Sequence, residues 1–188
     1  AARWYLGVPK YWAWWWSGVA VSETSSLGAQ SHLWNVVEQR FSPIVGSQGW
    51  RHLMPPFAKA WSALGPLRPQ LAKRYGLPQS IVVHAGCHDS SVNFYRYQAA
   101  SQQAFTVVST GTWIVAMGDK VALASLDEFR NMTCNSDVFG HPLGGALTMG
   151  GREFAHVAGE QPPSALVDAK ALERILAQGT MALPAFGA

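Results

Sequence analysis

The hydrophobic pattern of this sequence changes near residue 81, from helical and loop-like segments to β-branched runs. Before that point, Tyr11–Trp16 places Trp12, Trp15 and Trp16 at positions i, i+3 and i+4, which is the spacing of one helical face. After it, Ile81–Val83 is a short apolar run bounded by turn residues, which is typical of a buried strand. A chain that contains both kinds of segment is expected to fold as an α/β or α+β protein.

The same patterns predict further elements along the chain. Helices are expected at residues 33–40, 69–75, 91–97, 152–158 and 164–178, the last with its N-cap at Ser164. Strands are expected at 105–109 and 113–117, while the polar residues 22–27 are predicted to form a loop. The polar connector Ala99–Gln103 lacks apolar periodicity, so we place a domain boundary there, with one domain at 1–100 and a second at 101–188.

Composition excludes several classes of protein. With 48% hydrophobic residues the chain is too apolar for disorder, and its charge of +3 is scattered rather than gathered into the basic stripe of a nucleic-acid-binding protein. The apolar run at 11–21 is broken by Ser17 and Gly18 and is too short to span a bilayer. Cys87 and Cys134 have no metal-ligand spacing, which favours a reducing, cytoplasmic setting. Neither end has the polar composition of a tail, so we expect a segment of a longer chain.

Asp89 is the first candidate for a catalytic group. It follows a predicted strand and the turn Gly86–His88, and precedes a predicted helix, so its carboxylate is expected at the end of a strand, where ligand sites of α/β proteins form. The alternative is that Asp89 only caps the helix, which an aspartate before a serine commonly does. His88 could equally be a core histidine that donates to a carbonyl group.

A second candidate is the turn Ser109–Thr112, which lies between two apolar strands. Its glycine lets the backbone approach a ligand closely, and its N–H groups and threonine hydroxyls can donate to phosphate oxygens. The alternative is a plain hairpin turn. The sequence contains no Walker-type phosphate loop.

A third candidate is the glycine pair Gly150–Gly151, which precedes a predicted helix and could accept an anion at the helix start. Arg152 and Glu153 next to it could equally form a surface ion pair.

Taken in order, these segments resemble the FGGY carbohydrate kinases, and the His-Asp pair and the Ser-Thr-Gly-Thr-Trp turn are most similar to the rhamnulokinase and fuculokinase-like branch. The resemblance covers nearly the whole chain and rests on five short landmarks in register. They are Tyr11–Gly18, Glu23–Gly28, Gly86–Ser90, Ser109–Trp113 and Met149–Phe154.

The resemblance implies parts of two actin-like, ribonuclease-H-like domains with a cleft between them, and the phosphorylation of a sugar hydroxyl by ATP with Mg²⁺. In such a kinase Asp89 would act as the base and bind the sugar together with His88. Thr110, Gly111 and Thr112 would hold the ATP phosphates. The expected partners are a small sugar and ATP, without nucleic acid or membrane, and a homodimer is one of the assemblies left open.

The sequence also departs from the family pattern. It lacks the Asp-x-Gly-Thr motif that holds phosphate and Mg²⁺ in the first strand of the family, and the glycine-rich adenosine motif near the family's C-terminus. No metal ligand is therefore assigned, and the chain alone is expected to be inactive.

Two other functions stay open at this stage, a non-catalytic carbohydrate-binding module and a scaffold derived from a kinase. The tryptophans of residues 12–16 could stack on sugar rings, but adjacent residues of a helix point in different directions. We therefore predict that this cluster belongs to the core.

Overall fold

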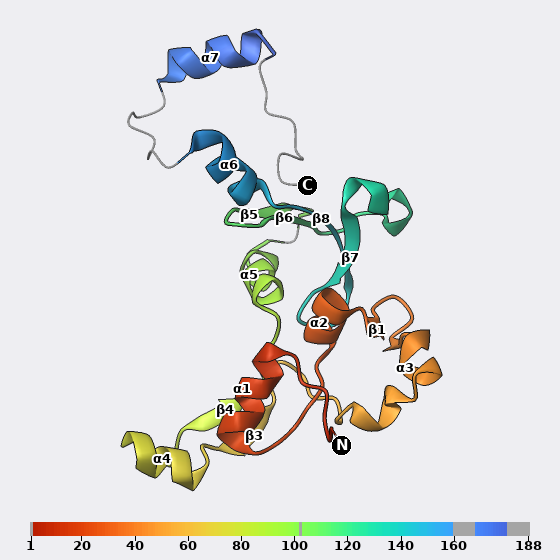
Figure 1. Ribbon diagram of the computed structural model, residues 1–188, viewed down its shortest axis with the longest axis vertical. Helices are drawn as coiled ribbons and strands as arrows, with labels where there is room; N and C mark the ends of the chain where they lie inside the picture. Colours follow the sequence, from red (N-terminus) through yellow and green to blue (C-terminus); the bar gives the residue numbers. More distant parts are fainter. Residues whose placement is uncertain (1, 102, 160–167, 180–188) are drawn as a thin grey trace.

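The computed structural model describes residues 2–101, 103–159 and 168–179 of the chain. Figure 1 shows α1, α4, β3 and β4 at one end and the group around α2, β1 and α3 beside them. A sheet of β5, β6, β8 and β7 lies beyond these two groups, with α5 beneath it and α6 at its edge. The structure is a mixture of helices and strands, as the sequence pattern predicted, and its paired strands are antiparallel.

Short helices and strand pairs make up the first part of the chain. The helices are α1 (Val8–Ser17), α2 (Thr24–Ser26), α3 (Pro43–Ser47) and α4 (Pro69–Tyr75), with a π-helical turn at Leu27–Ser31 and a 3-10 turn at Trp50–Leu53. The antiparallel strand pairs are β1 (Trp34–Asn35) with β2 (Arg40–Phe41), and β3 (Ala63–Pro66) with β4 (Val82–His84). Helices α1, α3 and α4 each have a proline in their first two positions, where its missing N–H leaves no helical hydrogen bond unmade.

The second part is built on one antiparallel sheet with strand order β5-β6-β8-β7. Its strands are β5 (Thr106–Ser109), β6 (Ile114–Gly118), β7 (Met132–Ser136) and β8 (Pro142–Thr148). The helices of this part are α5 (Asp89–Gln98), α6 (Gly150–Ala158) and α7 (Ala169–Ala177), and 3-10 turns at Leu123–Ser125 and Glu128–Arg130 lie between β6 and β7.

The hydrophobic core consists of three small clusters. The first contains Leu27, Leu33, Val45 and Met54, and the second contains Leu67, Leu71, Ala72 and Val83. The third joins Phe94 of α5 to Val107, Met117 and Leu143 of the sheet. Because the register pairs Val107 with Met117, these two side chains lie side by side on the face of the sheet that α5 covers.

Helix α5 therefore packs on the four-stranded sheet, although it precedes the predicted domain boundary at 99–103. The Phe94 and Phe105 rings stack with centroids 4.8 Å apart, and Ser91 Oγ donates to the Ser136 carbonyl over 2.7 Å. The connector joins two elements that pack together. The division into domains at 1–100 and 101–188 stays a prediction.

Several local predictions are confirmed. The helix at 69–75 matches α4, and the helices predicted at 91–97 and 152–158 match α5 and α6 within two residues at each end. The strands predicted at 105–109 and 113–117 match β5 and β6 within one residue. The helix predicted at 164–178 is present as α7 with Asp168 at its N-cap, and Ser164 lies outside the described residues.

Two local predictions are wrong. Residues 33–40 form most of the β1–β2 hairpin instead of a helix, because Asn35 Oδ1 accepts the N–H groups of Val37 and Glu38 and turns the chain. Residues 22–27 are not a polar surface loop. They contain α2, and Ser25 and Ser26 are buried because their hydroxyls donate to the Glu23 carboxylate.

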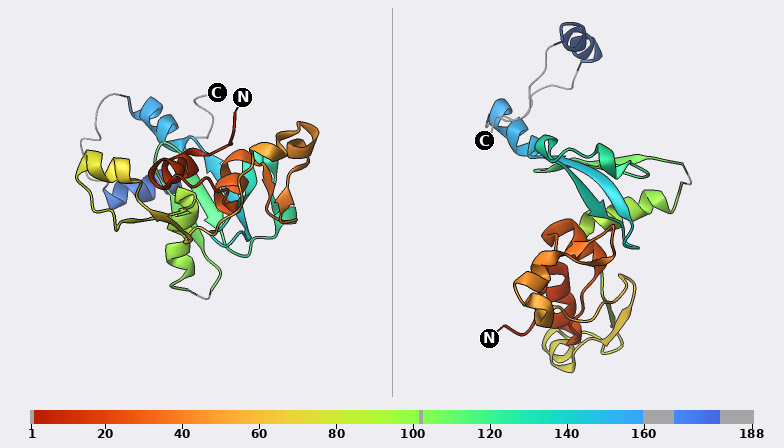
Figure 2. Two further views of the ribbon diagram at one scale, coloured as in Figure 1. Left: turned by 90° about the horizontal axis from the view of Figure 1, so that it is seen from below. Right: turned by 90° about the vertical axis from the view of Figure 1, so that its right-hand side faces the viewer.

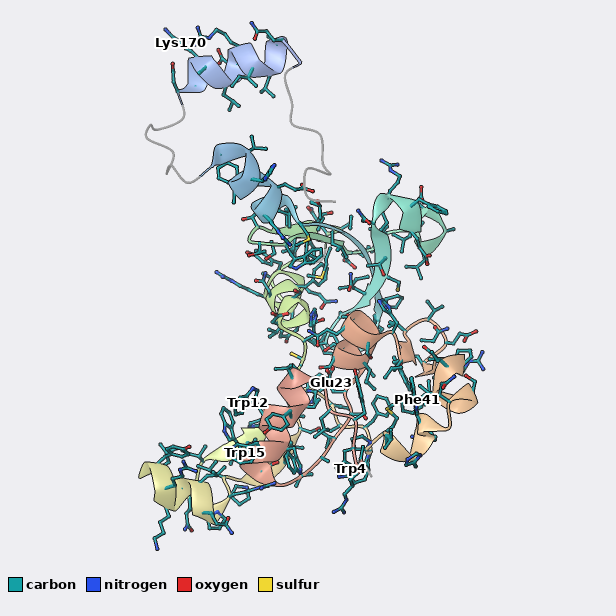
Figure 3. All side chains as sticks on the ribbon, viewed as in Figure 1. Trp4, Trp12, Trp15, Glu23, Phe41 and Lys170 are labelled. Carbon is teal, nitrogen blue, oxygen red and sulfur yellow. The ribbon has the colours of Figure 1, made fainter. Side chains whose placement is uncertain are left out.

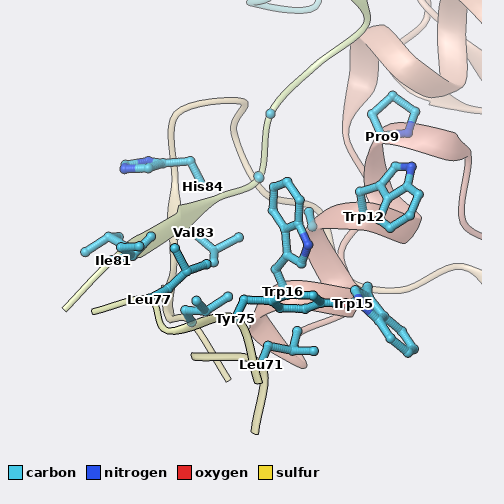
Figure 4. A pocket seen from close by; sticks show the side chains of 15 residues that line it. Pro9, Trp12, Trp15, Trp16, Leu71, Tyr75, Leu77, Ile81, Val83 and His84 are labelled. Carbon is cyan, nitrogen blue, oxygen red and sulfur yellow. The ribbon is translucent and has the colours of Figure 1, made fainter. Parts of the chain in front are cut away.

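The predicted burial of the tryptophan cluster is also wrong. Trp12, Trp15 and Trp16 share one face, as their spacing indicates, but this face lines a cavity of about 630 Å³ beside α4 and β4, and Trp15 is 36% exposed (Figure 4). The buried residues of α1 are Lys10 and Ala13. Strand β4 borders the same cavity, and of its three residues only Val83 is buried.

Within the described part of the chain, none of the helices combines the length and the apolar character that a bilayer span needs.

Candidate active site

Asp89 is the first residue of α5, and its side chain is 91% exposed. The N-cap position belongs to His88, so Asp89 does not cap the helix as the alternative interpretation expected. Its Oδ1 accepts the N–H of Ser90 over 2.6 Å, which is a contact within the same turn. The position at the positive end of the helix favours a negatively charged side chain that faces solvent.

His88 lies beside this carboxylate, with its Nε2 3.2 Å from Asp89 Oδ1 and only 14% of its side chain exposed. Burial lowers the pKa of His88 below its usual value, and the nearby Asp89 opposes the shift. A neutral ring can donate to Asp89 in the tautomer that carries its proton on Nε2. The structure therefore brings the two sequence-predicted sugar-site residues together.

A buried polar network lies directly behind the two residues, and the sequence analysis assigned it no role. Its centre is Glu23, whose side chain is fully buried between α1 and α2 (Figure 3). Glu23 Oε2 is 3.7 Å from Lys10 Nζ, and Ser25 Oγ both donates to Glu23 and accepts the His88 N–H. Burial lowers the pKa of Lys10, whereas Glu23 raises it. The sequence did contain a signal for this network, since Glu23 is followed by Thr-Ser-Ser. The hydroxyl and N–H groups of these residues can donate to the carboxylate and so allow it to be buried.

The turn at 110–112 joins β5 to β6, and Thr110, Gly111 and Thr112 are all exposed. The start of α6 packs against this turn. A Cβ atom on Gly151 would lie 1.9 Å from the Gly111 carbonyl oxygen, so only a glycine fits there. The turn Ser109–Thr112 and the glycine pair Gly150–Gly151, which the sequence analysis treated as separate candidates, therefore pack against each other.

The two candidate groups lie at the same end of the packed pair α5 and β5. Figure 2 shows α5 and β5 running in opposite directions, and Phe94 stacks on Phe105 between them. The start of α5, with Asp89, and the end of β5, with the 110–112 turn, are consequently on one side.

An apolar cavity lies one turn further along α5. Val92, at position i+3 from Asp89, and Tyr95 line a cavity of about 390 Å³ together with Trp61 and Phe139. Positions i and i+3 share a helical face, so Asp89 and Val92 lie on the same side of α5.

Among the residues that the structure describes, no three His, Cys, Asp or Glu side chains gather as metal ligands. Threonine hydroxyls and the backbone of an exposed turn do suit phosphate oxygens.

Comparison with known proteins identifies the fold. Residues 102–188 match the sequence profile of the carbohydrate kinase FGGY C-terminal domain. An L-fuculokinase of Salmonella typhi is 30% identical over 116 residues, which is 60% of this chain and 24% of that protein.

Solved structures agree with the sequence comparison. A carbohydrate kinase from Novosphingobium aromaticivorans is 35% identical with a TM-score of 0.78, over 94% of this chain and 41% of that one. A ligand-bound xylulose kinase from Lactobacillus acidophilus, 15% identical, shares the fold with a TM-score of 0.64, over 85% of this chain and 32% of that one. This chain thus spans less than half the length of each of these relatives. Residues 102–188 thus match the C-terminal domain of the FGGY carbohydrate kinases, and the chain as a whole is similar to part of a carbohydrate kinase.

Proposed function

We propose that this chain supplies the catalytic base and a phosphate-binding turn of an ATP-dependent sugar kinase. The observation that carries the proposal is the placement of Asp89, an exposed carboxylate at the start of α5 on the same side as the 110–112 turn. The match of residues 102–188 to the FGGY C-terminal domain supports it. The similarity to an L-fuculokinase makes ketoses such as L-fuculose the first substrates to test.

In the proposed reaction Asp89 accepts the proton of a sugar hydroxyl. The hydroxyl oxygen then bonds to the γ-phosphorus of ATP, the bond to the bridging oxygen breaks, and ADP leaves. His88 Nε2, next to the carboxylate, can hydrogen-bond the same sugar. Phosphoryl transfer passes through a loose transition state, so the protein contributes chiefly position and a proton acceptor.

The cofactor role falls to the hairpin turn. The hydroxyls of Thr110 and Thr112 and the N–H groups around Gly111 would donate to ATP phosphate oxygens. Mg²⁺ would neutralise phosphate charge when bound, and we assign it no ligand among the described residues. Because this chain spans only 24% and 41% of two relatives with identities of 30% and 35%, we expect it to be inactive by itself.

The cysteines support a reducing compartment. Cys87 and Cys134 are both free thiols, and sugar and ATP are cytoplasmic metabolites, so we propose that the parent enzyme works in the cytoplasm.

A sugar-binding module built on Trp12, Trp15 and Trp16 is supported less well. The rings are exposed enough to stack on a sugar, but the cavity that they line is otherwise mainly aliphatic. Sugar sites need converging hydrogen-bond partners for the hydroxyls, and Tyr75 and His84 are the polar contributions of the neighbouring elements.

The test uses a hybrid in which these 188 residues replace the matched segment of the Novosphingobium kinase. With a panel of ketoses and sugar acids, we expect sugar-dependent ADP release by the hybrid and none by the isolated chain. Asp89→Asn should lower kcat by about 10²–10⁴, the usual contribution of a general base, and change sugar affinity less.

Thr112→Ala is the matched control, since it should raise KM for ATP and leave sugar binding unchanged. A near-normal kcat in Asp89→Asn would remove the residue from the mechanism. ADP release by the isolated chain would contradict its expected inactivity.

A further inference from the structure

The segment that precedes α5, residues 85–88, is held by side chains from two distant elements. Lys10 Nζ, on α1, donates to the Ala85 carbonyl over 2.8 Å and also to the Gly86 carbonyl. Ser25 Oγ, on α2, accepts the His88 N–H over 3.0 Å. The carbonyls of Ser62 and Ala60 complete the set, because they accept the N–H groups of Ala85 and Gly86.

Glu23 connects these two side chains. Its carboxylate accepts the N–H and hydroxyl groups of Ser25 and Ser26 over 2.7–3.0 Å and lies 3.7 Å from Lys10 Nζ. Lys10 is 3% exposed and Glu23 is fully buried. Two buried charges are costly to desolvate, and they persist where the geometry satisfies them fully.

We propose that Lys10, Glu23 and Ser25 are positioning residues for the His88–Asp89 pair, and that they act by fixing the backbone of residues 85–88. The inference rests on the proposed role of Asp89.

The contacts of Asp89 itself explain why such support matters. Within the described part of the chain, its carboxylate contacts neighbouring groups, the N–H and hydroxyl of Ser90 and the ring of His88. The direction of the side chain therefore depends on the backbone before α5. At Gly86, φ is +68°, a conformation open chiefly to glycine, so the backbone changes direction just before His88. Displacing a reacting group by an ångström can lower a rate by about 10²-fold.

Ser25 and Ser26 provide a matched pair of variants. Both hydroxyls donate to Glu23 Oε2, over 2.7 Å and 2.9 Å, and both residues are buried. Only Ser25 accepts the His88 N–H. Ser25→Ala removes the contact to the turn, whereas Ser26→Ala removes an equivalent hydroxyl without touching it.

The first experiment follows amide hydrogen exchange of His88 by NMR in the full 188-residue chain. Exchange should become about 10-fold faster or more in Ser25→Ala, because a buried N–H loses its acceptor, and change less than about 3-fold in Ser26→Ala. Equal effects in the two variants, or no effect in Ser25→Ala, would overturn the proposal. Because this measurement involves no turnover, its failure is distinguishable from failure of the kinase proposal.

The second experiment measures kinetics in the active hybrid. Ser25→Ala should lower kcat at least about 10-fold, with the KM for ATP unchanged because the 110–112 turn lies on other elements. Ser25→Thr restores the hydroxyl and should recover part of the loss. Ser26→Ala should stay within about 3-fold of the parent. A KM effect for ATP alone, or equal kcat losses in the two alanine variants, would contradict the assignment.

Discussion

Replacing Gly151 by alanine tests how closely α6 approaches the 110–112 turn. The new Cβ would lie 1.9 Å from the carbonyl oxygen of Gly111, 2.7 Å from its carbonyl carbon and 2.9 Å from the Thr112 Cα. Carbon–oxygen contacts begin at roughly 3.3 Å, so helix and turn must separate by more than an ångström. All three atoms are backbone, and no side-chain rotation relieves the overlap.

Two opposing terms set the magnitude. Alanine in place of glycine favours a helix by about 0.5–1 kcal/mol, whereas overpacking of this kind costs about 1–3 kcal/mol and sometimes more. We expect Gly151→Ala to lower the free energy of unfolding by about 1 kcal/mol or more. Residues 110–112 should also shift in the amide spectrum.

Gly150→Ala is the matched control, one residue earlier in the same helix. Its Cβ would meet Ile114 Cδ1 at 2.5 Å, a side-chain atom that can rotate away, so the change should stay within about 0.5 kcal/mol. Urea unfolding of both variants measures the difference. If Gly151→Ala were as stable as Gly150→Ala, or more stable, the close approach would be refuted.

Two further predictions concern burial. Phe94→Ala should lower the free energy of unfolding by about 3–5 kcal/mol, because this ring is fully buried in the third cluster. Trp15→Ala should lower it by about 1 kcal/mol, because Trp15 is 36% exposed. Thermal melts compare the two variants, and a larger loss of stability in Trp15→Ala would show that Trp15, rather than Phe94, is the core residue. Burial lowers the pKa of His88 below 6.5, so the unfolded chain binds its proton more readily and stability is lost as pH falls through 6.5. His88→Gln should flatten this loss between about pH 7.5 and 5 in urea titrations, and an unchanged slope would show that other groups cause it.

Local sequence patterns predicted the second part of the chain well. Thr106–Ser109 and Ile114–Gly118 are β-branched runs on either side of a Thr-Gly-Thr turn, and both the strands and their pairing follow from neighbours in sequence. Helix α4 follows in the same way from Pro69 at its start and Gly76 beyond its end. The strand–turn–helix order around Asp89 likewise placed the candidate base at a helix start.

Burial was harder to predict, because it depends on what covers a face. The spacing of Trp12, Trp15 and Trp16 correctly gives one face of α1, but spacing does not say whether other elements fill the space in front of it. In this structure α4 and β4 border that space without closing it. Hydrophobic residues often stay partly exposed, so an aromatic stripe alone does not establish a core.

The parts of the site that escaped sequence analysis are those that depend on contacts between distant residues. Lys10 and the Ala85 carbonyl are 75 positions apart, and Ser25 and the His88 N–H are 63 apart. No periodicity marks such pairs, and a lysine in a tryptophan-rich helix looks like a solubilising charge. Its burial makes sense only once the carboxylate of Glu23 and two carbonyls are seen to surround it. The position of the candidate base could be predicted because it depends on adjacent residues. The contacts that hold its backbone in place could not, because they join residues that meet only in the folded chain.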